Sequence, residues 1–106
     1  MKKDKKTIMQ AIAKRAHEVV PAGSTVLLYG SQARGDARPG SDWDILILLD
    51  KDHITFEDHD KIAYPIHTLG WDIDEFINPI LFTKGQWNEN RYTPFHQNVE
   101  EDAIVL

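Results

Sequence analysis

Apolar side chains recur at helical spacing near the start of the chain. Within residues 7–20, Ile8, Ile12 and Ala16 fall on one face, while charged residues occupy the others. Pro-Ala-Gly at residues 21–23 ends the periodic segment, because proline and glycine both interrupt a helix. We therefore expect an amphipathic helix over residues 7–20 whose apolar face packs on the rest of the protein.

Two apolar runs follow this helix and predict strands, over residues 24–29 and 42–49. The last five positions of the second run are all apolar, which is typical of a strand buried on both faces in the middle of a sheet. Between the runs, residues 31–34 are expected to form a short helical turn. Residues 36–41 contain Pro-Gly and are expected to form a loop.

The pattern of residues 55–68 predicts a second long helix. Thr55 can cap its N-terminus, and Asp58 suits its first turn, where a carboxylate interacts favourably with the helix dipole. Pro65 conflicts with a straight helix, because it lacks a backbone N–H and its ring clashes with the preceding turn. We therefore predict a kink or an early end at Pro65, with Gly70 ending the segment.

The remaining apolar run, residues 76–82, predicts a third strand. Pro79 lies inside this run, and a proline is tolerated in a strand only at an edge, at a bulge or at the start. Residues 83–90 are expected to form a short helical turn. Residues 94–101 are expected to form a final helix that Thr93 caps.

The order of these elements is helix, strand, short helix, strand, helix, strand, helix. This order predicts an α/β fold of the α+β type, in which a small mixed sheet has helices packed on one side. At 106 residues we expect a single domain over residues 1–106 with one modest core. The inward-facing positions of the predicted elements place these residues in that core: Ile12, Leu28, Ile45, Ile47 and Phe82.

The composition excludes several classes of protein. A net charge of −5 argues against direct nucleic-acid binding, because phosphate backbones are held mainly by Lys and Arg. The chain has no cysteine, which rules out disulfides and thiolate zinc sites. No apolar stretch reaches membrane-spanning length, so we expect a cytoplasmic protein without membrane contact.

The two predicted strands carry the residues with the clearest chemistry. Gly30 and Ser31 end the first strand in a tight turn, where backbone N–H groups and a hydroxyl can receive phosphate oxygens. Asp42 and Asp44 open the second strand on one shared face, because alternate side chains of a strand point the same way. Adjacent carboxylates repel each other unless a cation lies between them, and a hard divalent cation suits oxygen ligands. The turn and the carboxylate pair together indicate phosphoryl or nucleotidyl transfer.

This arrangement resembles the motif of the minimal nucleotidyltransferases of the DNA polymerase β superfamily, in which Gly-Ser is followed after ten residues by Asp-x-Asp. The resemblance implies a polymerase-β-like nucleotidyltransferase fold. It also implies an enzyme that transfers AMP from ATP, with Mg²⁺ or Mn²⁺ held by the two aspartates. The chain carries family residues at these motif positions: Gly30, Ser31, Ala33, Arg34, Gly35, Ser41, Asp42 and Asp44.

The resemblance also assigns roles within the site. Gly30 and Ser31 would hold the terminal phosphates of the nucleotide. Arg34 would either reach a phosphate or pair with a carboxylate and fix the loop, and the sequence leaves both roles open. These enzymes usually carry a third catalytic carboxylate on the third strand, which completes the metal site and accepts the proton of the incoming hydroxyl.

The chain departs from the family at this third position, which best matches Asn78. An asparagine can act as a ligand through its carbonyl oxygen, but it carries no charge and accepts no proton. Asp74 has the same strand parity as Asn78. A bulge at Pro79 or a register shift would therefore bring Asp74 or Glu75 to the site as a substitute.

The resemblance further implies a protein partner. Stand-alone members of this kind often act as antitoxins that pair with a small helical HEPN-type ribonuclease toxin, and some adenylylate it. We therefore expect an antitoxin that transfers AMP to a hydroxyl of such a partner. Asn78 favours a second interpretation, in which a catalytically impaired module binds nucleotide or partner and neutralises the partner by contact.

Overall fold

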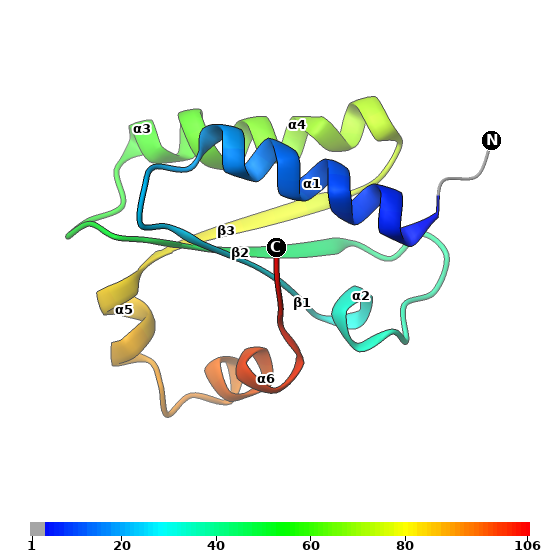
Figure 1. Ribbon diagram of the computed structural model, residues 1–106. Coiled ribbons are helices and arrows are strands. Elements are labelled where there is room, and N and C mark those ends of the chain that lie inside the picture. Colours follow the sequence, from blue (N-terminus) through cyan, green and yellow to red (C-terminus); the bar gives the residue numbers. More distant parts are fainter. Residues whose placement is uncertain (1–3) are drawn as a thin grey trace.

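The computed structural model describes residues 4–106, and its centre is a four-stranded mixed sheet (Figure 1). The strands are β1 (Thr25–Tyr29), β2 (Trp43–Leu49), β3 (Ile77–Thr83) and β4 (Ile104–Val105), in the order β3-β2-β1-β4. β1 runs antiparallel to both β2 and β4, whereas β2 and β3 are parallel. β2 is a central strand and is buried on both faces, as its unbroken apolar run predicts.

Helices lie on both faces of the sheet. Figure 1 shows α1, α3 and α4 along one face, and α5 and α6 on the other. The mixed α/β fold class is therefore confirmed, but the expectation of helices on one side holds only for the longer ones. The bounds of the helices are α1 Lys5–Val19, α2 Ser31–Arg34, α3 Phe56–Asp58, the π-helical segment η1 His59–Ala63, α4 Tyr64–Ile73, α5 Lys84–Glu89 and α6 Pro94–Asp102.

The larger hydrophobic cluster lies between the sheet and the long helices. Four of the five expected core residues belong to it, each with no exposed surface: Ile12, Leu28, Ile45 and Ile47. Phe82 is the exception, because β3 begins at Ile77 and directs Leu81 toward this cluster. Phe82 therefore points to the opposite face, where it packs with Leu46 and Trp87 in a second cluster. An apolar second face of β2 and β3 is the reason that α5 and α6 cover it.

The segment around Pro65 is neither sharply ended nor a regular α-helix. The chain stays helical from Phe56 to Ile73, and the π-helical segment His59–Ala63 directly precedes Tyr64 and Pro65. A proline crowds the carbonyl four residues earlier, and a wider turn relieves that contact, as π-bulges do inside α-helices. The predicted end at Gly70 is wrong, because Asp74 ends the helix in the left-handed conformation, with φ 57°.

β3 is an edge strand, which is one of the three positions expected for a strand that contains Pro79. Its register with β2 is continuous from Trp43↔Ile77 to Leu49↔Thr83, so no bulge interrupts it. The opposite edge is β4, a short strand that the sequence pattern did not predict. Within the described range, every helix is too short or too polar to span a membrane.

Truncation of Ile47 to alanine is expected to lower the free energy of unfolding by about 2–5 kcal/mol, the usual range for a large buried aliphatic side chain. Ile47 has no exposed surface and lies at the centre of β2. Chemical denaturation measures the change, and Val105→Ala, at an exposed position of β4, is the control. A loss well under about 1 kcal/mol for Ile47→Ala would contradict the central position of β2.

Candidate active site

The turn between β1 and α2 lies directly against a carboxylate of β2. Gly30 has φ 76° and is the N-cap residue of α2. A Cβ atom at Gly30 would lie 2.5 Å from Asp44 Oδ2, which is closer than real Cβ contacts. Glycine is therefore required here twice, by the backbone conformation and by the approach of Asp44. The Gly-Ser turn and the Asp-x-Asp segment, separate in sequence, form one site.

Asp44 lies between two polar side chains on the same face of the sheet. The strand register pairs it with Tyr29 of β1 on one side and with Asn78 of β3 on the other. Asp42 is exposed and immediately precedes β2, so alternation places it on this face as well. The third catalytic position of the family motif, as matched from the sequence, is thus next to Asp44 in the fold.

The electrostatics of this face favour a cation. Burial raises the pKa of Asp44, and a hydrogen bond from Asn78 lowers it. The negative charge of Asp42 raises this pKa further, whereas the positive charge of Arg34 lowers it. Burial, helped by Asp44, also raises the pKa of Tyr29 to about 12. The Asp44 carboxyl and the Tyr29 phenol therefore share a region in which negative charge is unfavourable. A bound cation would relieve this repulsion.

Arg34 pairs with carboxylates on both sides of its turn. Its Nε lies 3.2 Å from Asp36 Oδ2 in the following loop, and its Nη1 lies 3.5 Å from Asp102 Oδ2 at the end of α6. Of the two roles open to Arg34, the structure shows the carboxylate pairing that fixes the loop. The pairing with Asp102 also ties α6 to the Gly-Ser turn, beside a cavity of about 200 Å³ that Tyr29, Gly30 and Arg34 line.

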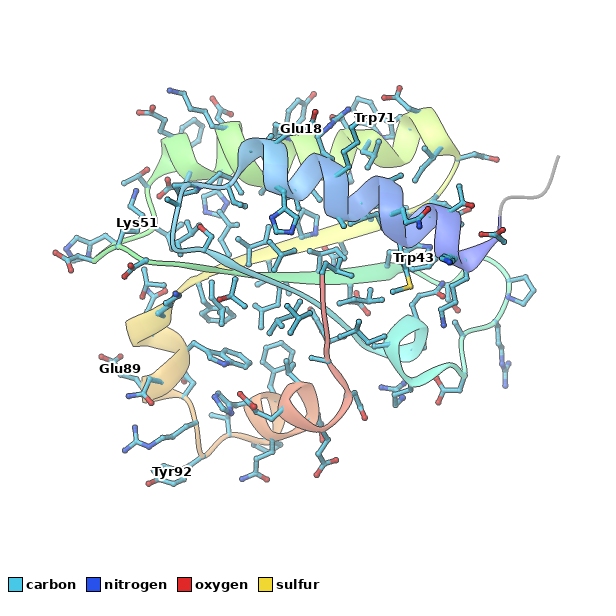
Figure 2. All side chains as sticks on the ribbon, viewed as in Figure 1. Glu18, Trp43, Lys51, Trp71, Glu89 and Tyr92 are labelled. Atoms are coloured by element: carbon cyan, nitrogen blue, oxygen red, sulfur yellow. The ribbon has the colours of Figure 1, made fainter. Side chains whose placement is uncertain are left out.

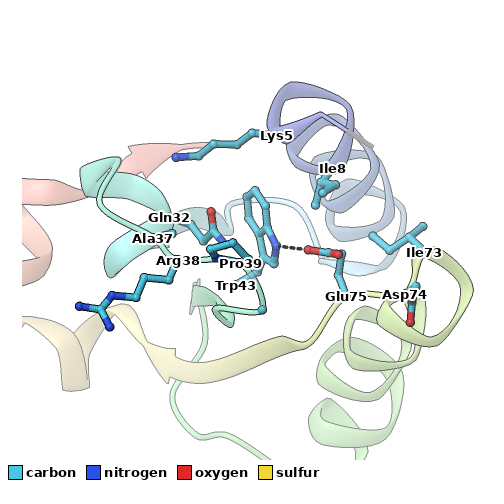
Figure 3. A pocket seen from close by; sticks show the side chains of 11 residues that line it. Lys5, Ile8, Gln32, Ala37, Arg38, Pro39, Trp43, Ile73, Asp74 and Glu75 are labelled. Atoms are coloured by element: carbon cyan, nitrogen blue, oxygen red, sulfur yellow. Dashed lines mark hydrogen bonds between the residues drawn. The ribbon is translucent and has the colours of Figure 1, made fainter. Parts of the chain in front are cut away.

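Asp74 and Glu75 do not lie beside Asp44. The β2–β3 register is continuous, so the bulge or shift that would bring them to that face does not occur. Asp74 is the left-handed residue that ends α4. Glu75 Oε1 accepts a hydrogen bond of 2.9 Å from Nε1 of Trp43, whose side chain is directed to the opposite face of β2 (Figure 3). Both residues line a cavity of about 440 Å³ on that opposite side.

Comparison with known proteins identifies the family. The family model of the nucleotidyltransferase domain matches residues 9–102. This chain belongs to the nucleotidyltransferase domain family. A solved structure described as the "Crystal structure of the toxin-antitoxin with AMP-PNP" has the same fold, with a TM-score of 0.64 and 18% sequence identity over 91% of this chain and 69% of that chain. None of the curated proteins matches.

The donor atoms of this nucleotidyltransferase domain suit a hard divalent cation. Asp42 and Asp44 offer carboxylate oxygens, and Asn78 offers a carbonyl oxygen, which are ligand types that Mg²⁺ accepts. Among the described residues, no group of three or more His, Cys, Asp or Glu side chains is arranged to hold a metal ion. Two carboxylates and one carbonyl oxygen would leave positions on Mg²⁺ for water and substrate phosphates.

Sequence reasoning missed three residues that shape the candidate site. Tyr29 could have been found, because it precedes Gly30 and strand pairing places it beside the second predicted strand. Asp102 gave no signal, since its partner Arg34 is distant in the sequence. Gln32 Nε2 donates a 3.3 Å hydrogen bond to the carbonyl of Ser41, which links α2 to the loop before Asp42, and this bond also has no local sequence signature.

Asp44→Asn is expected to raise the thermal unfolding temperature of the metal-free protein at pH 7. The folded-state pKa of Asp44 is raised above 3.8, chiefly by burial, so ionisation of this carboxyl destabilises the folded state. The protonated Asp44 carboxyl stabilises the folded state fully below its unfolded-state pKa. This contribution is lost as the pH rises through the folded-state pKa. The advantage of the variant should therefore disappear below pH 3.8.

Scanning calorimetry across this pH range, with chelator present, measures the effect. Asp52→Asn, an exposed loop substitution, is the control for the simple loss of one negative charge. A variant no more stable than the wild type at pH 7 would show that burial of the Asp44 carboxylate is not costly.

Proposed function

We propose that this protein is a Mg²⁺- or Mn²⁺-dependent adenylyltransferase that moves AMP from ATP to a hydroxyl of a partner protein and acts as an antitoxin. The observation that carries the proposal is the contact of Gly30 with Asp44. This contact puts the Gly-Ser turn next to the Asp-x-Asp segment, which supports the binding of one nucleotide by both. In-line displacement at phosphorus requires positioning and charge neutralisation more than a covalent group from the protein.

Each residue has a defined task in this proposal. The backbone at Gly30 and the hydroxyl of Ser31 would hold the β- and γ-phosphates. Asp42 and Asp44, with the Asn78 carbonyl, would hold the divalent ion. When bound, that ion would neutralise charge on the phosphates and on the leaving pyrophosphate. Arg34 would exchange one of its carboxylate partners for a phosphate oxygen, because a guanidinium binds both.

The acceptance of the hydroxyl proton is the weak step at this site. Asn78 cannot accept a proton. Tyr29, the other strand neighbour of Asp44, has a pKa of about 12 and so stays protonated at neutral pH. Neither residue beside Asp44 can therefore serve as a general base. This observation supports the alternative function, a catalytically impaired module that binds nucleotide or partner and neutralises the partner by contact.

The proposed partner is a small helical HEPN-type toxin in the cytoplasm, and no direct contact with nucleic acid is proposed. The structurally similar protein is described as a toxin-antitoxin with AMP-PNP, which supports both a protein partner and an adenine nucleotide. The net charge of −5 is compatible with a basic partner.

Labelled ATP distinguishes these functions. The purified protein is incubated with Mg²⁺, the protein encoded beside it, and ATP labelled at the α- or the γ-phosphate. Adenylyl transfer predicts that only the α-label enters the partner and that pyrophosphate is released. Calorimetric ATP binding and partner binding without label transfer would establish the impaired module. Transfer of the γ-label, or no ATP binding at all, would contradict the proposal.

A further inference from the structure

A row of aromatic rings lies along α4 and the start of β3. Tyr64 contacts Trp71 with ring centroids 6.3 Å apart, His67 contacts Trp71 at 5.8 Å, and His67 contacts Phe76 at 6.0 Å, all edge to face. His67 Nδ1 is 2.9 Å from the carbonyl oxygen of Ile77, which fixes the middle ring to β3. We call Tyr64, His67, Trp71 and Phe76 the aromatic row.

Most of this aromatic surface faces solvent. Trp71 is 68% exposed, Phe76 is 60% exposed and Tyr64 is 56% exposed. The other two tryptophans of the chain, Trp43 and Trp87, are buried, with exposed fractions of 2% and 7%. Figure 2 shows Trp71 on the outer side of the α4 layer, away from the sheet. Contiguous exposed aromatics of this kind mark interaction surfaces, where Trp and Tyr contribute most of the binding energy.

Beside the aromatic row is a hollow of about 290 Å³ with an acidic lining. Two of its residues are carboxylic acids, and none of the described residues that line it is a lysine or an arginine. Figure 3 shows the two acids, Asp74 and Glu75, at the end of α4. The hollow is lined by Gly40, Ser41, Gly70, Trp71, Asp74, Glu75 and Phe76.

This surface borders the backbone of the Asp-x-Asp segment from the α4 side of the sheet, whereas the Asp44 carboxylate points to the other face. The carbonyl of Phe76 accepts a 2.8 Å hydrogen bond from the backbone N–H of Trp43, the residue between the two aspartates. Ser41 lines the hollow and immediately precedes Asp42. A chain bound in the hollow would therefore lie next to the Asp-x-Asp segment, on the β3 side. The Gly-Ser turn lies on the other side, at the end of β1.

We propose that the aromatic row and its acidic hollow form the docking surface for a cationic segment of the acceptor protein. An arginine or lysine over Trp71 or Phe76 gains cation–π attraction, and Asp74 neutralises its charge. An apolar occupant would instead bury the Asp74 carboxylate without a partner for its charge. The identification of the bound protein as the acceptor rests on the proposed function, whereas the cationic chemistry follows from the surface itself.

Two synthetic peptides of equal length test this surface, one with repeated Arg-Gly-Ser and one with repeated Glu-Gly-Ser. All three tryptophans fluoresce, but Trp71 is the only exposed one in the described chain, so the fluorescence change that disappears in Trp71→Ala reports occupancy. The arginine peptide should change this signal at physiological salt, and the glutamate peptide should not. With dye-labelled arginine peptide, Trp71→Ala and Asp74→Asn should each weaken binding by about tenfold, as loss of an interface anchor does.

Matched substitutions control for nonspecific attraction to an acidic protein. Phe56→Ala removes another exposed aromatic, and Asp52→Asn removes another exposed charge, and both should leave the peptide affinity unchanged. Asparagine also tolerates the left-handed conformation of residue 74, so Asp74→Asn preserves the turn. Unchanged binding of Mn²⁺-ATP by the Trp71 and Asp74 variants shows that the nucleotide site is intact.

Three results would overturn the proposal. They are equal binding of both peptides, equal effects of the control and test substitutions, and self-association of the protein through Trp71 in light scattering. Peptide binding with the expected pattern in a protein that never transfers AMP would sustain the docking surface and refute the proposed catalytic function.

Discussion

Asn78→Asp is expected to raise adenylyl transfer to the partner protein by about 10²–10⁴-fold, the usual contribution of general base catalysis. The register places residue 78 directly beside Asp44, on the strand that carries the third catalytic carboxylate in the enzymes this motif resembles. An aspartate there would add a charge for the divalent ion and an acceptor for the hydroxyl proton. In the absence of metal the variant should be less stable than the wild type, because a third negative charge joins Asp42 and Asp44.

Single-turnover transfer of α-labelled AMP, with saturating ATP and Mg²⁺, measures this gain. Asn88→Asp, on the exposed side of α5, introduces the same charge away from the site and should leave the rate unchanged. Strong wild-type transfer that Asn78→Asp does not increase would show that another group already accepts the proton. In that case the impaired-module alternative would also be wrong.

Gly30→Ala is expected to reduce adenylyl transfer by about 10²-fold or more, the cost of misplacing catalytic groups by an ångström. A Cβ atom at residue 30 would lie 2.5 Å from Asp44 Oδ2. The alanine would also have to adopt the backbone conformation of Gly30, with φ 76°. Either Asp44 or the Gly-Ser turn must then move, and the contact that unites phosphate binding with the carboxylates is lost. Nucleotide affinity should fall together with the transfer rate.

Gly40→Ala separates the clash from the backbone strain. Gly40 also has a positive φ, of 84°, but a Cβ atom there meets nothing within 4 Å. Gly30→Ala should lose more stability than Gly40→Ala in chemical denaturation, because the clash adds to the strain, and only Gly30→Ala should lose nucleotide affinity in calorimetry. Equal loss of nucleotide affinity in the two variants would mean that strain in the loop, and not the contact with Asp44, governs the site.

Local signals explain what could be predicted from the sequence. The strand-ending Gly-Ser and the Asp-x-Asp before an unbroken apolar run each lie within a few residues, so their positions on β1 and β2 follow from strand periodicity. The missing N–H of Pro79 limits it to an edge, a bulge or the start of a strand, and the structure has it on an edge strand. The position of Asn78 beside Asp44 required one further step, the family motif.

The features that could not be predicted depend on tertiary contacts. The pairing of Arg34 with Asp102 and the hydrogen bond of Trp43 to Glu75 join segments that no local pattern connects. The short strand β4 exists because β1 offers it an edge. Phe82 lies in the second cluster and not in the expected one, because β3 begins at Ile77 and its parity directs Phe82 to the face that α5 and α6 cover.

Titration of isotope-labelled protein with Mn²⁺-ATP tests the central claim most directly, namely that the Gly-Ser turn and the two aspartates bind one metal–nucleotide complex. The paramagnetic ion broadens the amide signals of residues near it. The account predicts early broadening at Gly30, Ser31 and residues 42–44, and no such broadening in an Asp42→Asn, Asp44→Asn double variant. Broadening of the same signals that survives in the double variant would contradict the account.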